Sequence, residues 1–123
     1  MHVSCRSVFA RILLSFAPAL LLVCGAAQAA NVTYRCTLKD VMVFSNRVHC
    51  QCKTATTDGT ATIRFFAVPT SDVKLADRLL SVGTTALVSN RVFIATYSAG
   101  DTSGNNFGCG PTDCRKLVWF GIE

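Results

Sequence analysis

The sequence predicts a mainly β fold with one helix, placed between the third and fourth of five strands. The prediction starts from the stretch Thr60–Tyr97, in which residues 60–68 alternate between apolar and polar side chains as a strand does. Residues 70–90 then show helical spacing, and Arg91–Tyr97 again has the composition of a strand. Strand-like patterns flank this stretch on both sides, so the rest of the chain is also expected to be β.

Two strands are predicted before this stretch. Val32–Val43 is rich in β-forming residues and is expected to be one long strand, bulged near Lys39 and Asp40. After a turn at Ser45–Asn46, Arg47–Thr54 alternates cleanly. One face of this second strand carries Val48, Cys50 and Cys52, and the other carries Arg47, His49, Gln51 and Lys53.

The pair Asp58–Gly59 is a strong hairpin signal, because glycine accepts the positive φ that a tight turn requires. With these two residues as the loop, Thr57 is expected to oppose Thr60. The same register sets Cys52 opposite Phe65 and Cys50 opposite Ala67. It gives the two strands one shared face, made of Cys50, Cys52, Ile63, Phe65 and Ala67.

The helix is expected to begin after Pro69, with Thr70 or Ser71 as its cap, and to stop at Asn90 in the left-handed conformation. Its apolar face is predicted to hold Ala76, Leu79, Leu80, Gly83 and Leu87. A long loop, Ser98–Asp113, rich in Gly, Ser, Asn and Asp, precedes the last strand, Arg115–Ile122. The near-continuous apolar run of that strand predicts cover on both faces, by the core and by a neighbour.

This order of elements, β-β-β-α-β-β, is that of the OB-fold, a five-stranded Greek-key barrel whose helix lies between strands 3 and 4. Residues 31–123 are expected to form this single domain. Residues 1–30 are interpreted as a secretory signal peptide, with a basic start, an apolar run too short to span a bilayer, and an A-x-A site at Ala27–Ala29. A lipoprotein box at Leu21–Cys24 is the less favoured alternative, because Val23 is bulky for such a box. The protein is therefore expected to be secreted or periplasmic, with no membrane span.

Charge and chemistry argue for a binding protein. Residues 31–123 have a net charge of +3, spread over the chain, which is too weak to indicate nucleic-acid binding. The single histidine of this domain, His49, is expected at the surface, on the face opposite Cys50 and Cys52, so no nucleophile and base are brought together. No catalytic site, cofactor or metal is predicted.

In an exported chain the cysteines are first read as disulfides. Cys109 and Cys114 are separated by four residues, which favours a structural loop disulfide over a redox pair or a zinc site. Cys36 is expected to bridge either Cys50 or Cys52, and one cysteine then remains unpaired.

Recognition is expected in the Ser98–Asp113 loop, because OB-folds use the loop between strands 4 and 5. Short polar side chains around an aromatic ring suit sugar hydroxyls, although an ordinary solvated loop has a similar composition. The candidate contacts to a cell-surface oligosaccharide are Tyr97, Asp101, Ser103, Asn105, Asn106 and Phe107. Trp119 and Phe120 are assigned to the core or to an interface.

Residues 61–69 (ATIRFFAVP), the helix and Arg91–Tyr97 (RVFIATY) resemble the centre of the cholera-type binding subunits of bacterial A–B toxins. Three features are closer to the B subunits of subtilase cytotoxin, typhoid toxin and the pertussis-like toxins: the early pair Cys36 and Cys50, the run TAL at residues 85–87, and NFGCGPTDC at residues 106–114. The resemblance implies a disulfide from Cys36 to Cys50. It also implies a homopentamer of OB-folds that binds cell-surface glycans and carries a separate enzymatic A subunit.

The resemblance has one gap. The subtilase and typhoid members contact sialic acid through a serine in a segment before the first cysteine, and residues 31–35, which precede Cys36 in the predicted mature chain, contain no serine. No glycan-contact residue is therefore carried over from that family. The alternative function is a small periplasmic or secreted OB-fold protein that binds another protein, such as an inhibitor or an envelope factor.

Overall fold

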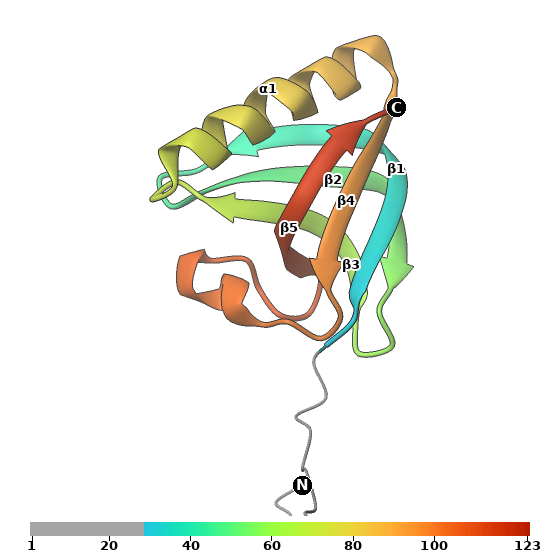
Figure 1. Cartoon of the computed structure of the whole chain (residues 1–123), viewed down its shortest axis with the longest axis vertical. Helices are drawn as coiled ribbons and strands as arrows, with labels where there is room; N and C mark the ends of the chain where they lie inside the picture. Colours follow the sequence, from blue (N-terminus) through green and yellow to red (C-terminus); the bar gives the residue numbers. More distant parts are fainter. Residues whose placement is uncertain (1–28) are drawn as a thin grey trace, which may run out of the picture.

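A computed structural model describes residues 29–123, so the predicted signal peptide lies outside the described residues except at its end. Figure 1 shows a β-barrel with a helix across one end. The elements are β1 (Asn31–Val43), β2 (Arg47–Thr57), β3 (Thr62–Pro69), α1 (Val73–Ser89), β4 (Val92–Ser98), a short 3-10 helix η1 (Ser103–Phe107) and β5 (Cys114–Ile122). The predicted mainly β fold, with its helix between the third and fourth strands, is confirmed.

The sheet closes on itself in the order β1-β2-β3-β5-β4, which is the arrangement of an OB-fold. All neighbouring strands are antiparallel except β3 and β5, which are parallel over three residue pairs. The long strand β1 pairs with both β2 and β4 and carries a bulge between Leu38 and Asp40, where the sequence predicts one. Closure leaves few unpaired strand edges.

Helix α1 lies over one open end of the barrel and buries Ala76, Leu79, Gly83 and Ala86. Its cap is Asp72, one residue later than predicted, because the carboxylate of Asp72 accepts a hydrogen bond from the backbone N–H of Leu75 at 3.1 Å. The helix ends at Asn90 in the left-handed backbone conformation, as predicted. Leu80 was predicted to face the core but is exposed, and Ala86 is buried instead. The buried stripe of α1 is therefore narrower than the apolar pattern suggests.

The predicted β2–β3 register is wrong. Thr57 pairs with Thr62, and Cys50 pairs with Phe66 instead of Ala67. The turn is longer than two residues, because Oδ1 of Asp58 accepts hydrogen bonds from the backbone N–H groups of Thr60 and Ala61 and holds both in the turn.

An irregularity in the β2–β3 pairing also shifts the alternation of β3 between Ile63 and Phe66. Ile63 and Phe66 are fully buried in the barrel core with Cys50 and Cys52. Phe65 and Ala67 lie on the other side of the sheet, against Cys109 and Cys114. The predicted shared face of β2 and β3 is therefore only partly correct.

Two disulfides form, Cys36–Cys52 and Cys109–Cys114. The second was predicted. The pairing of Cys36 with Cys50, which the family resemblance implies, is wrong, because Cys52 takes that place and Cys50 remains a buried free thiol. A Cβ atom on Gly83 would lie 2.9 Å from the sulfur of Cys50, so α1 fits closely against this thiol. Disulfides of this kind are typical of exported chains.

Strand β5 exposes part of its apolar run. Its pairing with β4 shifts between Thr96 and Tyr97, so that Val118 has no partner and the inward–outward alternation is interrupted. Leu117 is buried, whereas Val118 is 52% and Trp119 49% exposed. Within residues 29–123, the helices lack the length and apolar character needed to cross a membrane.

Candidate functional site

The strongest candidate site is the outer face of β2 and β3, together with the end of the loop that joins β4 to β5. We call it the β2–β3 face. It contains two adjoining pockets of about 220 and 250 Å³, which share Phe65 and Asp113. The first is also lined by Arg47, His49, Gly108, Gly110 and Cys114, and the second by Gln51, Ala55, Thr62 and Arg64.

Strand alternation explains why these side chains gather there. Val48, Cys50 and Cys52 point into the barrel, so the residues between them on β2 are placed on its outer side. On β3, the irregular stretch turns Phe65 outward. The backbone carbonyl of Asp113 accepts hydrogen bonds from the N–H groups of Arg64 and Phe65, at 2.9 and 3.0 Å, and so joins the end of the loop to this face.

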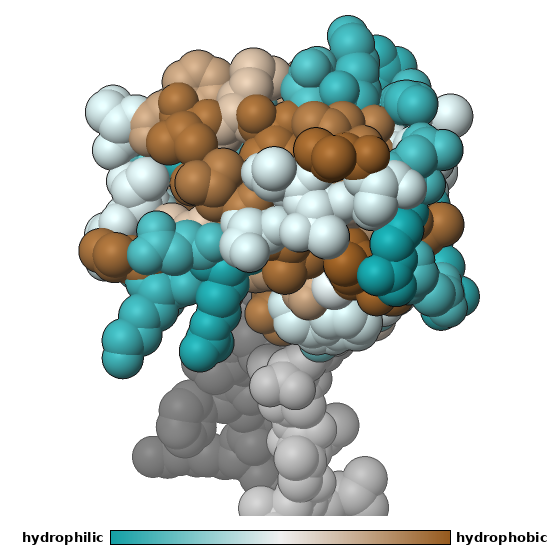
Figure 2. All heavy atoms as spheres, turned by 90° about the horizontal axis from the view of Figure 1, so that it is seen from above, coloured by the Kyte–Doolittle hydropathy of each residue, from teal (hydrophilic) through white to brown (hydrophobic). Residues whose placement is uncertain are grey.

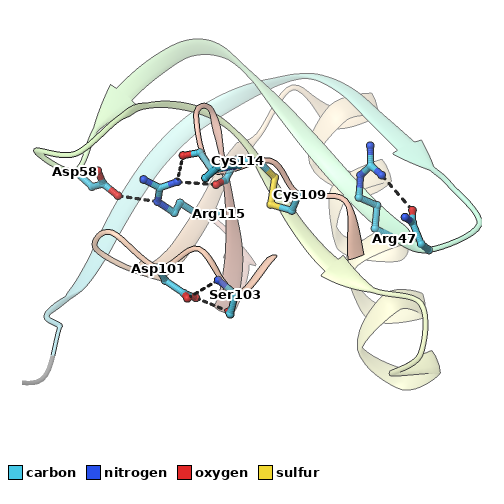
Figure 3. Close-up of a disulfide and its surroundings, with 9 residues drawn as sticks. Arg47, Asp58, Asp101, Ser103, Cys109, Cys114 and Arg115 are labelled. Atoms are coloured by element: carbon cyan, nitrogen blue, oxygen red, sulfur yellow. Dashed lines mark hydrogen bonds and ion pairs between the residues drawn. A yellow bond between two sulfur atoms is a disulfide. The ribbon is translucent and has the colours of Figure 1, made fainter. Parts of the chain in front are cut away.

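Glycine allows the loop to pass closely over Arg47. Gly108 has φ +83°, and a Cβ there would lie 2.7 Å from Nη1 of Arg47. The Arg47 guanidinium is also held by Asn46, whose side-chain oxygen accepts a hydrogen bond at 3.1 Å, and by Phe44, whose ring centre lies 4.1 Å away. The Cys109–Cys114 disulfide then links this part of the loop to the first residue of β5 (Figure 3).

A buried ion pair fixes the other side of this loop (Figure 3). Nε of Arg115 lies 2.8 Å from the Asp58 carboxylate, and both side chains are almost fully buried. Arg115 also donates to the carbonyls of Pro111 and Cys114, and Asp58 accepts from the N–H of Gly100 at 2.9 Å. The pair therefore ties the β2–β3 turn to both ends of the loop.

The protonation of Asp58 follows from these contacts. Burial alone would raise the pKa of its carboxyl, because burial disfavours the charged form. Hydrogen bonds from Arg115, Thr60 and Gly100 outweigh this and hold the pKa of Asp58 well below its usual range. Asp58 is thus a permanently charged part of the scaffold, since all its oxygens are occupied inside the protein.

The sequence predicts His49 at the surface, and this prediction is wrong. The residue is only 7% exposed. Its ring lies between Phe44 and Phe65, with ring centres 4.9 and 5.2 Å away. Burial, and then the charge of Arg47, lowers its pKa, so the imidazole is neutral at pH 7. Its Nε2 atom is buried without a hydrogen-bond partner, and a buried polar atom left unpaired costs about 1–3 kcal/mol.

The sequence-predicted loop residues do not line either pocket of the β2–β3 face. Asp101 accepts hydrogen bonds from the N–H and the hydroxyl of Ser103, both at 2.9 Å, and so holds the turn that leads into η1. Asn105 and Asn106 are exposed on η1. Asp101 and Ser103 therefore shape the loop, while the two asparagines remain free to contact a partner.

The two aromatic candidates are turned inward. Tyr97 was predicted to contact ligand, but it is fully buried, with its ring 5.3 Å from that of Phe66. It belongs to the barrel core together with Phe93 and Ala95 of the same strand, and we correct its assignment to a core residue. Phe107 is half-buried and packs against the cluster of Ala67, Cys109 and Cys114.

The residues missed by sequence reasoning are Arg47, His49, Gln51, Phe65 and Asp113. The first three were correctly placed together on the polar face of β2, and that face was the signal that could have identified the site. The position of Phe65 could not be found this way, because the irregular pairing of β3 is invisible in the alternation.

The side chains of the β2–β3 face can take part in noncovalent recognition. They offer two guanidinium groups, an amide, a carboxylate and an aromatic ring around shallow pockets. Among residues 29–123, no three His, Cys, Asp or Glu side chains lie close enough to hold a metal ion. The free thiol of Cys50 is buried inside the barrel, where burial raises its pKa to about 12 and keeps it protonated.

Comparison with family models, with curated proteins and with solved structures finds no match to this chain.

Proposed function

We propose that this chain is an exported, non-catalytic binding module whose β2–β3 face recognises an oligosaccharide on a cell surface. The observation that carries the proposal is the position of the two adjoining pockets. They lie on the strand 2–3 face and beside the loop between strands 4 and 5, which is where OB-folds bind oligosaccharides and oligonucleotides. The low net charge of the domain favours the oligosaccharide.

The side chains of this face suit a sugar ligand. Phe65 is half-buried between the two pockets and can stack on the apolar face of a sugar ring. Gln51, Arg64 and Asp113 surround it with donors and acceptors for hydroxyl groups. Asn105 and Asn106, exposed on η1, are available to longer glycans.

We further propose that the module acts as a receptor-binding B-type subunit of an A–B toxin-like complex. The resemblance in element order, together with the OB barrel, supports this assignment. A homopentamer would cover the exposed Val118 and Trp119, and a separate enzymatic A subunit would bind to the ring.

The outer side of α1 is a second surface that assembly would bury. Figure 2 views the molecule from this side and shows apolar side chains at the surface. Val73, Leu80 and Val88 of α1 are exposed, and a broad depression of about 630 Å³ lies along the helix. Its lining comes from one helix face alone, and none of these lining residues is buried, so it suits contact with protein better than binding of a small ligand.

A glycan array probed with the purified exported protein tests the ligand, and light scattering after size exclusion tests the assembly. We expect the wild type to bind glycans on the array and Arg64→Ala to bind them more weakly. Arg78→Ala changes an exposed residue of α1 and should bind as the wild type does. A monomer without glycan hits, which instead captures an envelope protein, would support the alternative of a protein-binding OB module. In that case the exposed Val118 and Trp119 would contact the envelope protein instead of a neighbouring subunit.

A further inference from the structure

We propose that the pocket between Arg47 and His49 is an oxyanion subsite, which binds the carboxylate or sulfate group of an acidic sugar. The inference rests on the proposed function, because it names the class of glycan that the β2–β3 face would select. It concerns the smaller of the two pockets, of about 220 Å³, which is lined by Arg47, His49, Phe65, Asp113 and two glycines of the loop.

Two nitrogen atoms of this pocket's side chains are unsatisfied. Nε2 of His49 and Nε of Arg47 are both buried and have no hydrogen-bond partner. Buried polar groups in proteins are nearly always paired, so two unpaired ones on residues lining the same pocket indicate a missing acceptor. Arg47 can only donate, and His49 can donate from Nε2, so a group that pairs with either nitrogen would offer an acceptor oxygen.

The charges around the pocket favour a negative group. Arg47 lies at the pocket, Arg64 at the adjoining one, and Asp113 is the only acid that lines either of them. Asp113 is exposed, so solvent screens its repulsion of an anion. Its carboxylate can instead accept a hydrogen bond from a hydroxyl group of the same sugar.

Arg47 is held in position before any ligand arrives. Asn46 accepts a hydrogen bond from its Nη1, the ring of Phe44 lies 4.1 Å from the guanidinium carbon, and Gly108 leaves room directly above it. A guanidinium held in this way loses little side-chain freedom when it binds an oxyanion.

The subsite is expected to be pH-dependent. The charged groups that act on His49 are Arg47 of the same strand, Asp113 of the loop and Asp40 of β1. In the empty pocket, burial and Arg47 keep the imidazole neutral, whereas a bound oxyanion would favour the protonated ring. Affinity for an oxyanion should therefore rise as the pH falls from about 7.5 to about 5.5.

The experiment is a nitrogen-15 NMR titration of the histidine ring in the protein purified after export. The probes are sodium sulfate, sodium glucuronate and glucose, with sodium chloride at matched ionic strength, and a His49→Gln variant assigns the resonance. We expect a saturable shift of the His49 ring nitrogens and a raised pKa with sulfate or glucuronate, but not with glucose or chloride. A response to sulfate alone identifies a sulfate ester as the group, and a response to glucuronate alone identifies a carboxylate.

Two matched variants keep the inference falsifiable. Arg47→Gln should lower the affinity for the oxyanion at least about tenfold, because the substitution removes a charge-assisted hydrogen bond. Arg78→Gln, which removes an equal charge from exposed α1, should leave the affinity unchanged. The inference is overturned if neither probe gives a saturable shift or if Arg47→Gln binds as the wild type does.

The outcomes separate this inference from the proposed function. Glycan-array hits confined to neutral sugars, without an oxyanion response at His49, would refute the subsite and leave glycan binding standing. Oxyanion binding without any glycan hit would refute the proposed function and leave the subsite standing.

Discussion

Removing the charge of Asp58 is the most informative single change for the scaffold that supports the β2–β3 face. The Asp58 side chain is completely buried and the Arg115 side chain is 1% exposed, with 2.8 Å between Nε and the carboxylate. In Asp58→Asn the amide retains an oxygen for the backbone N–H groups of the turn, but the charge of Arg115 is left without compensation. The substitution therefore isolates the electrostatic part of the contact.

The expected loss is large. Breaking a buried ion pair by removing one partner typically costs about 3–5 kcal/mol, because an unpaired charge stays buried. The stability of a domain of this size is about 5–15 kcal/mol in total, so Asp58→Asn should remove a fifth or more of it. With about 4–8 °C per kcal/mol, the melting temperature should fall by at least about 12 °C.

Urea unfolding followed by circular dichroism, on Asp58→Asn, Arg115→Met and the double variant, measures the effect. We expect the double variant to lose at least about 2 kcal/mol less free energy of unfolding than the sum of the single losses, because it leaves no buried charge behind. Single losses below about 1 kcal/mol, or additive losses, would refute the assignment of this pair as the anchor of the loop.

The Asp58–Arg115 pair also predicts that the free energy of unfolding decreases in acid. Because the folded-state pKa of Asp58 is lowered, its contribution to stability is complete above the unfolded value of about 3.9 and is lost as the pH falls below it. The wild type should therefore lose stability more steeply than Asp58→Asn between about pH 4 and pH 2.

Two further predictions concern His49 and Gly83. Since the folded-state pKa of His49 is lowered, its contribution to stability is complete above about pH 6.5 and falls as the pH drops below that value. The urea midpoint should accordingly decrease between about pH 7.5 and pH 5 in the wild type and change less in His49→Gln, and equal slopes would contradict the burial argument. Gly83→Ala should destabilise the protein by about 1–2 kcal/mol in spite of its helix propensity, because the new Cβ would lie 2.9 Å from the sulfur of Cys50. In a Cys50→Ala background the same change should cost less, and an unchanged cost would show that the thiol is not the obstacle.

The fold could be predicted from the sequence because local patterns and global order agree. Asn90 marks the end of α1, and the order of strands around the helix leads directly to the barrel. The predictions that were wrong concern side chains that contact partners far away in the sequence. Asp58 lengthens its turn by accepting N–H groups of Thr60 and Ala61, and its second oxygen meets Arg115, 57 residues away in sequence.

The candidate site was predicted less well for the same reason. The composition of the loop predicts a site there, but the polar groups of Asp101 and Ser103 hydrogen-bond to each other in the turn before η1. The pocket is formed where Gly108 passes over Arg47, and no pattern within either segment indicates that contact. Similarly, the choice of Cys52 over Cys50 as partner of Cys36 follows from the β1–β2 register, in which Cys52 lies opposite Leu38 and Cys50 lies opposite Val41, farther along β1 from Cys36.

The central claim is that an oligosaccharide binds on the β2–β3 face. Chemical-shift mapping on the isotope-labelled protein, with a glycan selected from the array, tests it most directly. We predict the largest shifts at Arg47, His49, Phe65 and Asp113. Shifts confined to α1 and β5, or no glycan-dependent shifts at all, would contradict the claim.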